Sequence, residues 1–184
     1  MQCPEGLAKS LIWCDNYINQ KIFYNTMIKI KKASKKDKEI LLLFRYLLHI
    51  FESKVEKTDK FNVKIMQQDK EVMLEALEDK KVFFLIAYYD DMPVGYSKLK
   101  IKKINNEIMG HGGAIFVLEA YRGLKIGKKL FEAEVNILRK KKIKKFSIEV
   151  WKSNKLSIDV HKKLGFKMMG DGSNPKLYRM EKEI

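Results

Sequence analysis

The fold of this chain is decided by residues 121–130, which read YRGLKIGKKL. Residues 108–118, a long apolar segment typical of a strand, come before this stretch. Apolar residues at helical spacing follow it, namely Ile126, Leu130, Ala133 and Ile137, widened by Phe131 and Leu138. At a strand-to-helix junction the first N–H groups of the helix lack partners and the helix dipole adds positive charge, so the junction can hold a phosphate. A plain turn covered by solvated lysines is the alternative interpretation.

The residues before this junction predict one strand and two helices. Residues 24–32 favour a strand, and Ser34 and Asp37 stand at capping-box spacing in front of a helix. That helix carries apolar residues at helical period: Ile40, Leu41, Phe44, Leu47, Leu48 and Phe51. A second helix is predicted to open at Asp69.

Strands are predicted on both sides of the junction. Residues 82–89 and 94–103 favour a hairpin, and residues 146–150 favour a strand after the junction helix. A short helix should start at Asn154 and stop at Gly165, with an apolar side formed by Leu156, Val160 and Leu164. Two more strands end the chain. This order of elements is that of an α/β domain in which a later strand crosses over through a helix.

The composition indicates one globular domain, which we place at residues 24–184 after an N-terminal extension, residues 1–23. With 46% apolar and 11% aromatic residues among 184, the chain can bury a core and is not intrinsically disordered. The longest apolar run, residues 82–89, is far shorter than the roughly 20 residues of a membrane span. No secretory signal is visible, and Cys3 and Cys14 have no companions for a metal site, so we expect a cytoplasmic protein without a metal.

The positive charge is carried by lysine. The chain has 38 basic and 23 acidic side chains, but arginine occurs only at Arg45, Arg122, Arg139 and Arg179. Because nucleic-acid recognition favours arginine, nucleic acid is an unlikely partner and the lysines suit a solvated surface. A basic nucleic-acid or ribosome-binding module stays open as an alternative, with the basic run in residues 139–145 as its interface.

A second segment, residues 147–166, reads SIEVWKSNKLSIDVHKKLGF. Together with the junction it resembles the GNAT superfamily of acetyl-CoA-dependent N-acetyltransferases, over a stretch from about residue 24 to the C-terminus. Arg122 and Gly127 match the two ends of the family's pyrophosphate turn, whereas Lys125 stands where the family has its first glycine. The later family motif is matched by Asn154 and by Leu164, Gly165 and Phe166. His161 stands where the family usually has tyrosine, and Ser157 where it usually has alanine.

The resemblance implies a GNAT fold, that of the acyl-CoA N-acyltransferases, with a mixed, mostly antiparallel central sheet flanked by helices. It implies transfer of an acetyl group from acetyl-CoA to a primary amine of a small molecule or protein, by direct attack in a ternary complex. The residues that it places at the coenzyme are Ile115, Phe116, Val117, Arg122, Gly123, Leu124, Lys125, Ile126, Gly127, Lys128 and Asn154. A homodimer is compatible with the sequence, and a non-catalytic acyl-CoA binder of the same fold is a further alternative.

Three residues are candidates for the proton transfers of this reaction. An aliphatic amine has a pKa of about 10.4 and must lose a proton before it attacks, for which the resemblance offers Glu149 and His111 as bases. It also implies that His161, in place of the tyrosine, donates a proton to the departing thiolate. For Glu149 an ion pair with a lysine is the alternative, and for the two histidines a place in an ordinary strand or on a solvated helix.

Overall fold

The computed structural model describes residues 27–56 and 63–184. The expected N-terminal extension with its two cysteines, and the first residues of the strand predicted from residue 24, lie outside the described residues.

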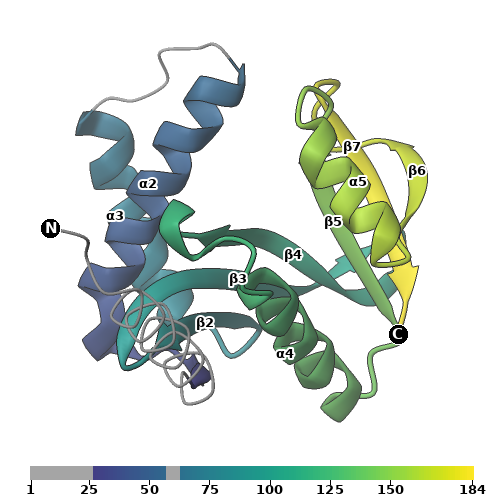
Figure 1. Cartoon of the computed structure of the whole chain (residues 1–184). Coiled ribbons are helices and arrows are strands. Elements are labelled where there is room, and N and C mark those ends of the chain that lie inside the picture. The colour runs from purple at the N-terminus through teal and green to yellow at the C-terminus, as the bar shows by residue number, and fades with distance from the viewer. Residues whose placement is uncertain (1–26, 57–62) are drawn as a thin grey trace, which may run out of the picture.

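A seven-stranded sheet forms the centre of the molecule, in the order β1-β2-β3-β4-β5-β7-β6 (Figure 1). Neighbouring strands are antiparallel except for β4 and β5, which are parallel. The strands are β1 Ile28–Lys32, β2 Val82–Tyr89, β3 Met92–Ile104, β4 Glu107–Val117, β5 Lys145–Trp151, β6 Lys167–Asp171 and β7 Leu177–Glu183. The predicted mixed, mostly antiparallel sheet is therefore confirmed.

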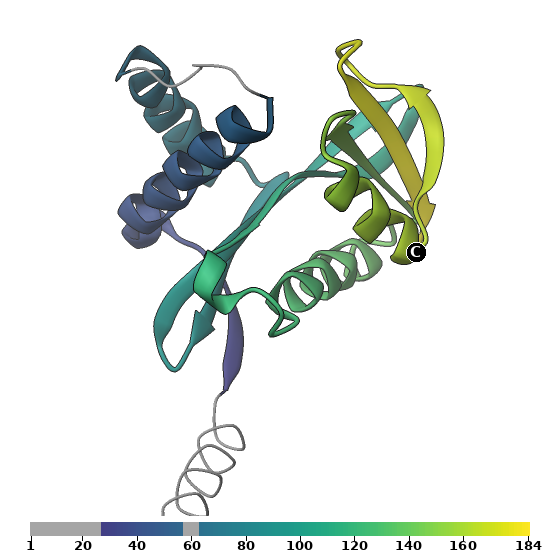
Figure 2. The same ribbon diagram turned by 45° about the horizontal axis from the view of Figure 1, so that its top comes forward.

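Helices cover both faces of this sheet (Figures 1 and 2). On one face α2 Lys38–Glu56 and α3 Val63–Glu78 pack Leu41, Phe44 and Met73 against β2, β3 and β4. On the other face α4 Ile126–Lys140 and α5 Lys155–Lys163 bury Phe131 and Ile158 with apolar residues of β5 and β7. Two short 3-10 helices, η1 Lys35–Asp37 and η2 Glu119–Tyr121, lead into α2 and away from β4.

The predicted boundaries hold for most elements, and two differences have clear causes. Ser34 and Asp37 form the expected capping box. However, α3 starts at Val63 and not at Asp69, because the Asp69 carboxylate pairs with Arg45 and His49 of α2 and does not cap its own helix. The hairpin turn is also shorter than predicted, and β3 starts at Met92, because Asp90 and Asp91 adopt φ angles of 46° and 65° that make a tight two-residue turn.

The parallel strands β4 and β5 part after only three paired positions. Gly110 pairs with Phe146, His111 with Ser147 and Gly112 with Ile148, and no pairing follows among the described residues of the two strands. On its other edge β4 stays paired with β3, with a register shift that leaves Gly113 as an extra residue between Gly112 and Ala114. The backbone of β4 beyond Gly112 therefore has one free edge with unused hydrogen-bonding groups, facing the opening between the strands.

Candidate active site

The segment between β4 and α4 forms a turn that exposes the start of a helix. Gly123 has a φ of 85° and Lys125, the N-cap of α4, has a φ of 60°. These left-handed conformations bend the chain so that α4 begins at Ile126, with no side chain capping its first amides. The free N–H groups and the positive end of the helix dipole are the features by which such a turn can hold an anion.

Space for an anion exists above the first turn of α4. A Cβ atom added to Gly127 would meet only Ile115 Cγ2, at 3.9 Å, so the main chain there is open to a ligand. Leu124 and Ile126 pack into the core under the turn, so only their backbone groups can reach such a ligand. Lys128 lies on the exposed side of α4, where its Nζ is 3.7 Å from Glu132 Oε1.

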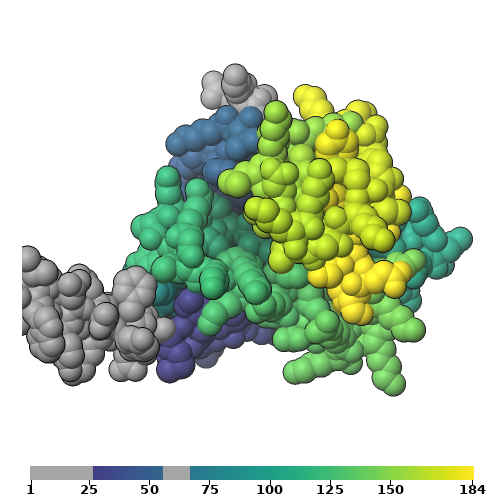
Figure 3. Space-filling view, turned by 45° about the vertical axis from the view of Figure 1, so that its right-hand side comes forward, coloured from purple at the N-terminus to yellow at the C-terminus, as the bar shows by residue number. Residues whose placement is uncertain are grey.

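A groove of about 370 Å³ runs from this turn to α5. In the space-filling view it lies between α5, in light green, and the green segment that enters α4 (Figure 3). The side chains of Leu156, Val160 and Leu164 line it. These residues form the apolar side that the sequence predicts for this helix, and this side faces the groove: Leu156 is 74% exposed and Val160 is 46% exposed, while Ile158 is the buried residue of α5.

The free edge of β4 forms the wall of the groove opposite α5. Ile115, Phe116 and Val117 all line it, although the Phe116 side chain itself is buried against α2. Arg122 closes one end: its Nε donates a hydrogen bond to the Val117 carbonyl oxygen at 3.2 Å, and its guanidinium carbon lies 5.3 Å from the centre of the Phe51 ring. Seven of the predicted coenzyme residues line this groove, namely Ile115, Phe116, Val117, Arg122, Gly127, Lys128 and Asn154. The other four, Gly123, Leu124, Lys125 and Ile126, lie in the turn but do not line it.

Ser157 of α5 holds both Asn154, the N-cap of this helix, and His161, in its last turn. The Asn154 side-chain oxygen accepts a hydrogen bond from the Ser157 amide at 3.0 Å, which leaves the Asn154 NH₂ group for a ligand. His161 Nδ1 lies 2.7 Å from the Ser157 carbonyl oxygen, to which it must donate. The neutral ring therefore carries its proton on Nδ1 and a lone pair on Nε2. Burial lowers the pKa of His161, although the bond to Ser157 opposes that shift.

Glu149 of β5 is fixed by the loop between β6 and β7. Its carboxylate oxygens accept hydrogen bonds from the Ser173 backbone amide and hydroxyl, both at 2.7 Å. Burial raises the pKa of Glu149, but these bonds and the charge of Lys102 outweigh it and leave the pKa lowered. The carboxylate is therefore ionised at neutral pH and pairs with Ser173, not with a lysine side chain as the alternative supposed.

His111 of β4 lies beside the paired end of β5. Ser147 Oγ donates to the Gly110 carbonyl oxygen at 3.3 Å and lies 3.0 Å from His111 Nδ1, so it accepts the Nδ1 proton. Burial and neighbouring Lys102 lower the pKa of His111 to about 4. The ring is therefore neutral at neutral pH, with Nε2 free to accept a proton.

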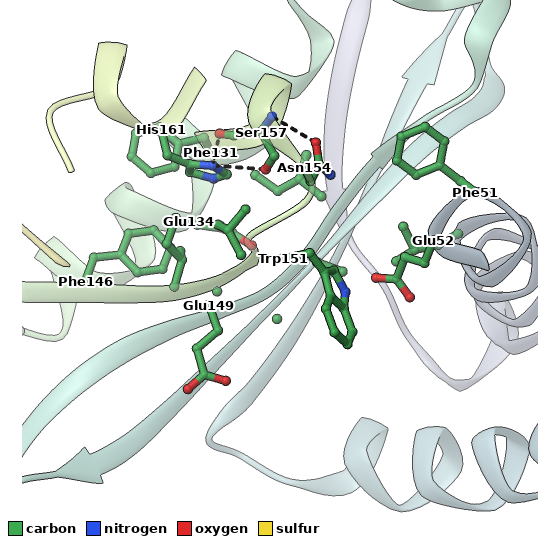
Figure 4. Close-up of a pocket in the computed structure, with 17 residues that line it drawn as sticks. Phe51, Glu52, Phe131, Glu134, Phe146, Glu149, Trp151, Asn154, Ser157 and His161 are labelled. Atoms are coloured by element: carbon green, nitrogen blue, oxygen red, sulfur yellow. Dashed lines mark hydrogen bonds between the residues drawn. The ribbon is translucent and has the colours of Figure 1, made fainter. Parts of the chain in front are cut away.

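A cavity of about 150 Å³ fills the opening between β4 and β5. Asn154, His161 and Glu149 line it, whereas His111 does not. Figure 4 shows His161 on one side of this cavity, with Glu149 pointing the other way. The wall also contains residues that the sequence does not predict to belong to the site: Leu48, Phe51, Glu52, Glu134 and Trp151. Of these, Glu134 carries a signal in the sequence, because it interrupts the i, i+4 apolar series of Ile126, Leu130 and Leu138.

The uncapped start of α4 thus lies beside two parallel strands that part. The model of the acetyltransferase (GNAT) family matches residues 46–166, and the chain belongs to this family. No curated protein matches the chain. The described helices include none long and apolar enough to cross a membrane, and the described residues contain no group of three or more His, Cys, Asp or Glu side chains arranged to bind a metal.

Solved structures support the same fold. The PaiA N-acetyltransferase of Thermoplasma acidophilum in complex with coenzyme A is 23% identical, with a TM-score of 0.70 over 86% of this chain and 99% of that one. A GNAT-family acetyltransferase of Staphylococcus aureus Mu50 is 20% identical, with a TM-score of 0.68 over 85% and 99%. A predicted acetyltransferase of Clostridium acetobutylicum with acetyl-CoA is 20% identical, with a TM-score of 0.66 over 80% and 93%.

Proposed function

We propose that this protein transfers an acetyl group from acetyl-CoA to a primary amine of a small molecule or protein. The observation that carries the proposal is the alignment of the bare start of α4 with the free edge of β4. A pyrophosphate on the amides of Gly127 and Lys128 would send the rest of the coenzyme along Ile115–Val117 toward the cavity between β4 and β5. The complexes of two structural neighbours, one with coenzyme A and one with acetyl-CoA, agree with this choice of ligand.

The backbone of the parted strands would bind and orient the thioester. Amides on the free edge of β4 can donate to the carbonyl oxygen, where negative charge develops as the amine attacks. The amide of Asn154 and the apolar stripe of α5 would hold the arm on its other side. Closing the groove around an apolar arm also excludes water that would compete with the amine.

The acceptor would approach from the opposite face of the sheet. There α2 and α3 stand on one side and β5 to β7 on the other, as Figures 1 and 2 show. Glu149 lines the cavity and remains the better placed of the two candidate bases, while His111 is next to it on β4. Both groups are unprotonated at neutral pH, so either can accept a proton from an amine, directly or through water.

The experiment that tests this function is a screen of an amine library with acetyl-CoA, in which release of the free thiol is measured. Thiol release that depends on one class of amine supports the proposal. Stabilisation by acetyl-CoA without thiol release for any amine would indicate the non-catalytic binder. Stabilisation by heparin or DNA but not by acetyl-CoA would indicate the nucleic-acid-binding alternative. A cytoplasmic location, which the sequence analysis expects, stays a prediction, and a homodimer stays only compatible with the sequence.

A further inference from the structure

Glu134 of α4 is a buried carboxyl group without a partner. Its residue is 1% exposed, and neither carboxyl oxygen has a hydrogen-bond partner among the described residues. Leaving such a group unsatisfied lowers the stability of the fold. An apolar residue would continue the stripe of Leu130 and Leu138 on this helix without that cost. A missing hydrogen-bond partner at this position therefore points to a ligand.

The carboxyl group of Glu134 belongs to the cavity between β4 and β5. Figure 4 shows it directed into that cavity, on the same side as His161. Its surroundings there are largely apolar, with Phe131, Phe146 and Ile148 in the same wall. The hydroxyl of Ser97, on β3, is also buried and lies near this carboxyl group, but the two groups do not form a hydrogen bond of normal geometry. The Glu134 oxygens therefore lie in the cavity wall without a well-formed hydrogen bond to any described residue.

The chemistry of the proposed function supplies that partner. When the C–S bond of the thioester breaks, the sulfur takes the electron pair, and a thiolate among apolar side chains is costly unless a proton reaches it. His161 is poorly suited to give this proton, because its Nδ1 proton is engaged with Ser157 and its Nε2 has none in the neutral ring. The low pKa of His161 makes the protonated ring scarcer still.

We infer that Glu134 is a catalytic residue whose carboxyl group contacts the sulfur end of the acyl-CoA and protonates the departing thiolate. This inference rests on the proposed function. The amine nitrogen forms a bond to the carbonyl carbon, the C–S bond breaks, and a proton moves from Glu134 to the sulfur. The surplus proton of the amine passes to solvent, and solvent reprotonates the Glu134 carboxylate when the thiol leaves.

The protonation state that this role requires follows from the surroundings of Glu134. Burial raises the pKa of Glu134 to about 8, with the nearby Ser97 hydroxyl acting in the opposite direction. The group therefore holds its proton at neutral pH. The other titratable residues that line the cavity are Glu52, Glu149 and His161.

The test compares single-turnover thiol release in wild type, Glu134→Gln, Ser97→Ala and His161→Ala, with an amine found in the screen. Glu134→Gln should slow the reaction by about a hundredfold and abolish the loss of rate above pH 8, because the amide cannot release a proton. Ser97→Ala should keep the maximal rate and move that loss to higher pH. The inference would be overturned if Glu134→Gln released thiol at the wild-type rate, or if only His161→Ala slowed thiol release.

A second variant separates catalysis from structure. Glu134→Leu restores the apolar stripe, so it should be more stable than wild type and still slow. If Glu134→Leu turns over at the wild-type rate, the carboxyl group has no catalytic part.

Calorimetry of coenzyme A binding tests the contact without turnover. In buffers of different ionisation enthalpy at pH 8, wild type should take up as much as about half a proton on binding, because the arriving ligand displaces water from a half-ionised carboxyl group. Glu134→Gln should take up less, and the adenine nucleotide portion of coenzyme A alone should not distinguish the two proteins. An equal proton uptake in both proteins would contradict the contact. If no amine supports thiol release in wild type, the proposed function fails while this measurement still decides the contact.

Discussion

At the scale of single residues, Lys125 combines an unfavourable backbone with a useful charge. Its φ of 60° is a conformation that glycine adopts freely and that costs other residues about 1 kcal/mol. Lys125→Gly should therefore raise the free energy of unfolding by roughly that amount and preserve or improve acetyl-CoA affinity. Denaturant unfolding and calorimetry measure the two effects. Lys125→Ala is the control, because it keeps the strained backbone but removes the charge. If Lys125→Gly and Lys125→Ala both lose more than tenfold in acetyl-CoA affinity, the Lys125 ammonium group itself binds phosphate.

Gly127 tests the phosphate site without disturbing the fold. A Cβ fits there at an ordinary contact distance from Ile115, and alanine in place of glycine in a helix adds up to about 1 kcal/mol of stability. Gly127→Val should fold, because the added groups extend into the groove, but should lose at least about tenfold in coenzyme affinity, equivalent to 1.4 kcal/mol. Gly127→Ala is the control for backbone effects. Full affinity in the valine variant, measured by calorimetry, would show that the pyrophosphate binds elsewhere.

At the scale of elements, α5 separates a core face from a ligand face. Ile158 is 8% exposed within the core, whereas Val160 lines the groove. Ile158→Ala should cost about 2–5 kcal/mol of stability, as large-to-small core changes do. Val160→Ala should change stability little and weaken acetyl-CoA binding severalfold. Thermal unfolding and calorimetry on the pair check this division, and equal destabilisation by both changes would place Val160 in the core.

Periodicity predicted which elements exist, but it did not show what each one faces. An apolar stripe has the same pattern whether it meets a core or a ligand, so the sequence alone does not show that Leu156 and Val160 line a groove. The early start of α3 was missed for a related reason, since an aspartate that caps a helix and one that pairs across to another helix look alike in sequence.

The parts of the site that are formed by local backbone conformation could be predicted from the sequence. The turn at Gly123 to Gly127 and the cap at Asn154 depend on local sequence and are where they were expected. The opening between β4 and β5 depends on a parallel pairing that stops after Gly112, and nothing local in either strand encodes that stop. Glu134 becomes notable only when this opening is known, because its position in an apolar stripe alone suggests a misfit.

At the scale of the whole molecule, Glu134 and His111 should make stability depend on pH in opposite senses, so that their effects largely cancel between about pH 4.3 and 6.5. Glu134 loses its proton at about pH 8 in the folded protein and near pH 4.3 when unfolded, so its contribution to stability falls as pH rises between these values. His111, with a pKa of about 4 when folded and about 6.5 when unfolded, contributes stability that is lost as pH falls through this window.

Above about pH 6.5 the histidine effect is complete and only the glutamate effect remains. Wild type should therefore be less stable at pH 8 than at pH 6.5, and Glu134→Gln should lack that part of the decline. Denaturant unfolding at both pH values measures the difference between the two proteins. Parallel declines would mean that the Glu134 carboxyl group is already ionised at neutral pH.

Because β4 and β5 separate, a bound coenzyme would hold the two parts of the sheet together. Three paired positions join the backbone of β1 to β4 to that of β5, β7 and β6. A ligand arm that forms hydrogen bonds to the free edge of β4 and contacts α5 would bridge the gap between β4 and β5. Ligand binding to the folded state alone adds about 2.7 kcal/mol of stability at a hundredfold excess over Kd. The liganded sheet should then resist proteolysis and amide exchange as one unit, while the empty protein opens first along the line where its strands diverge.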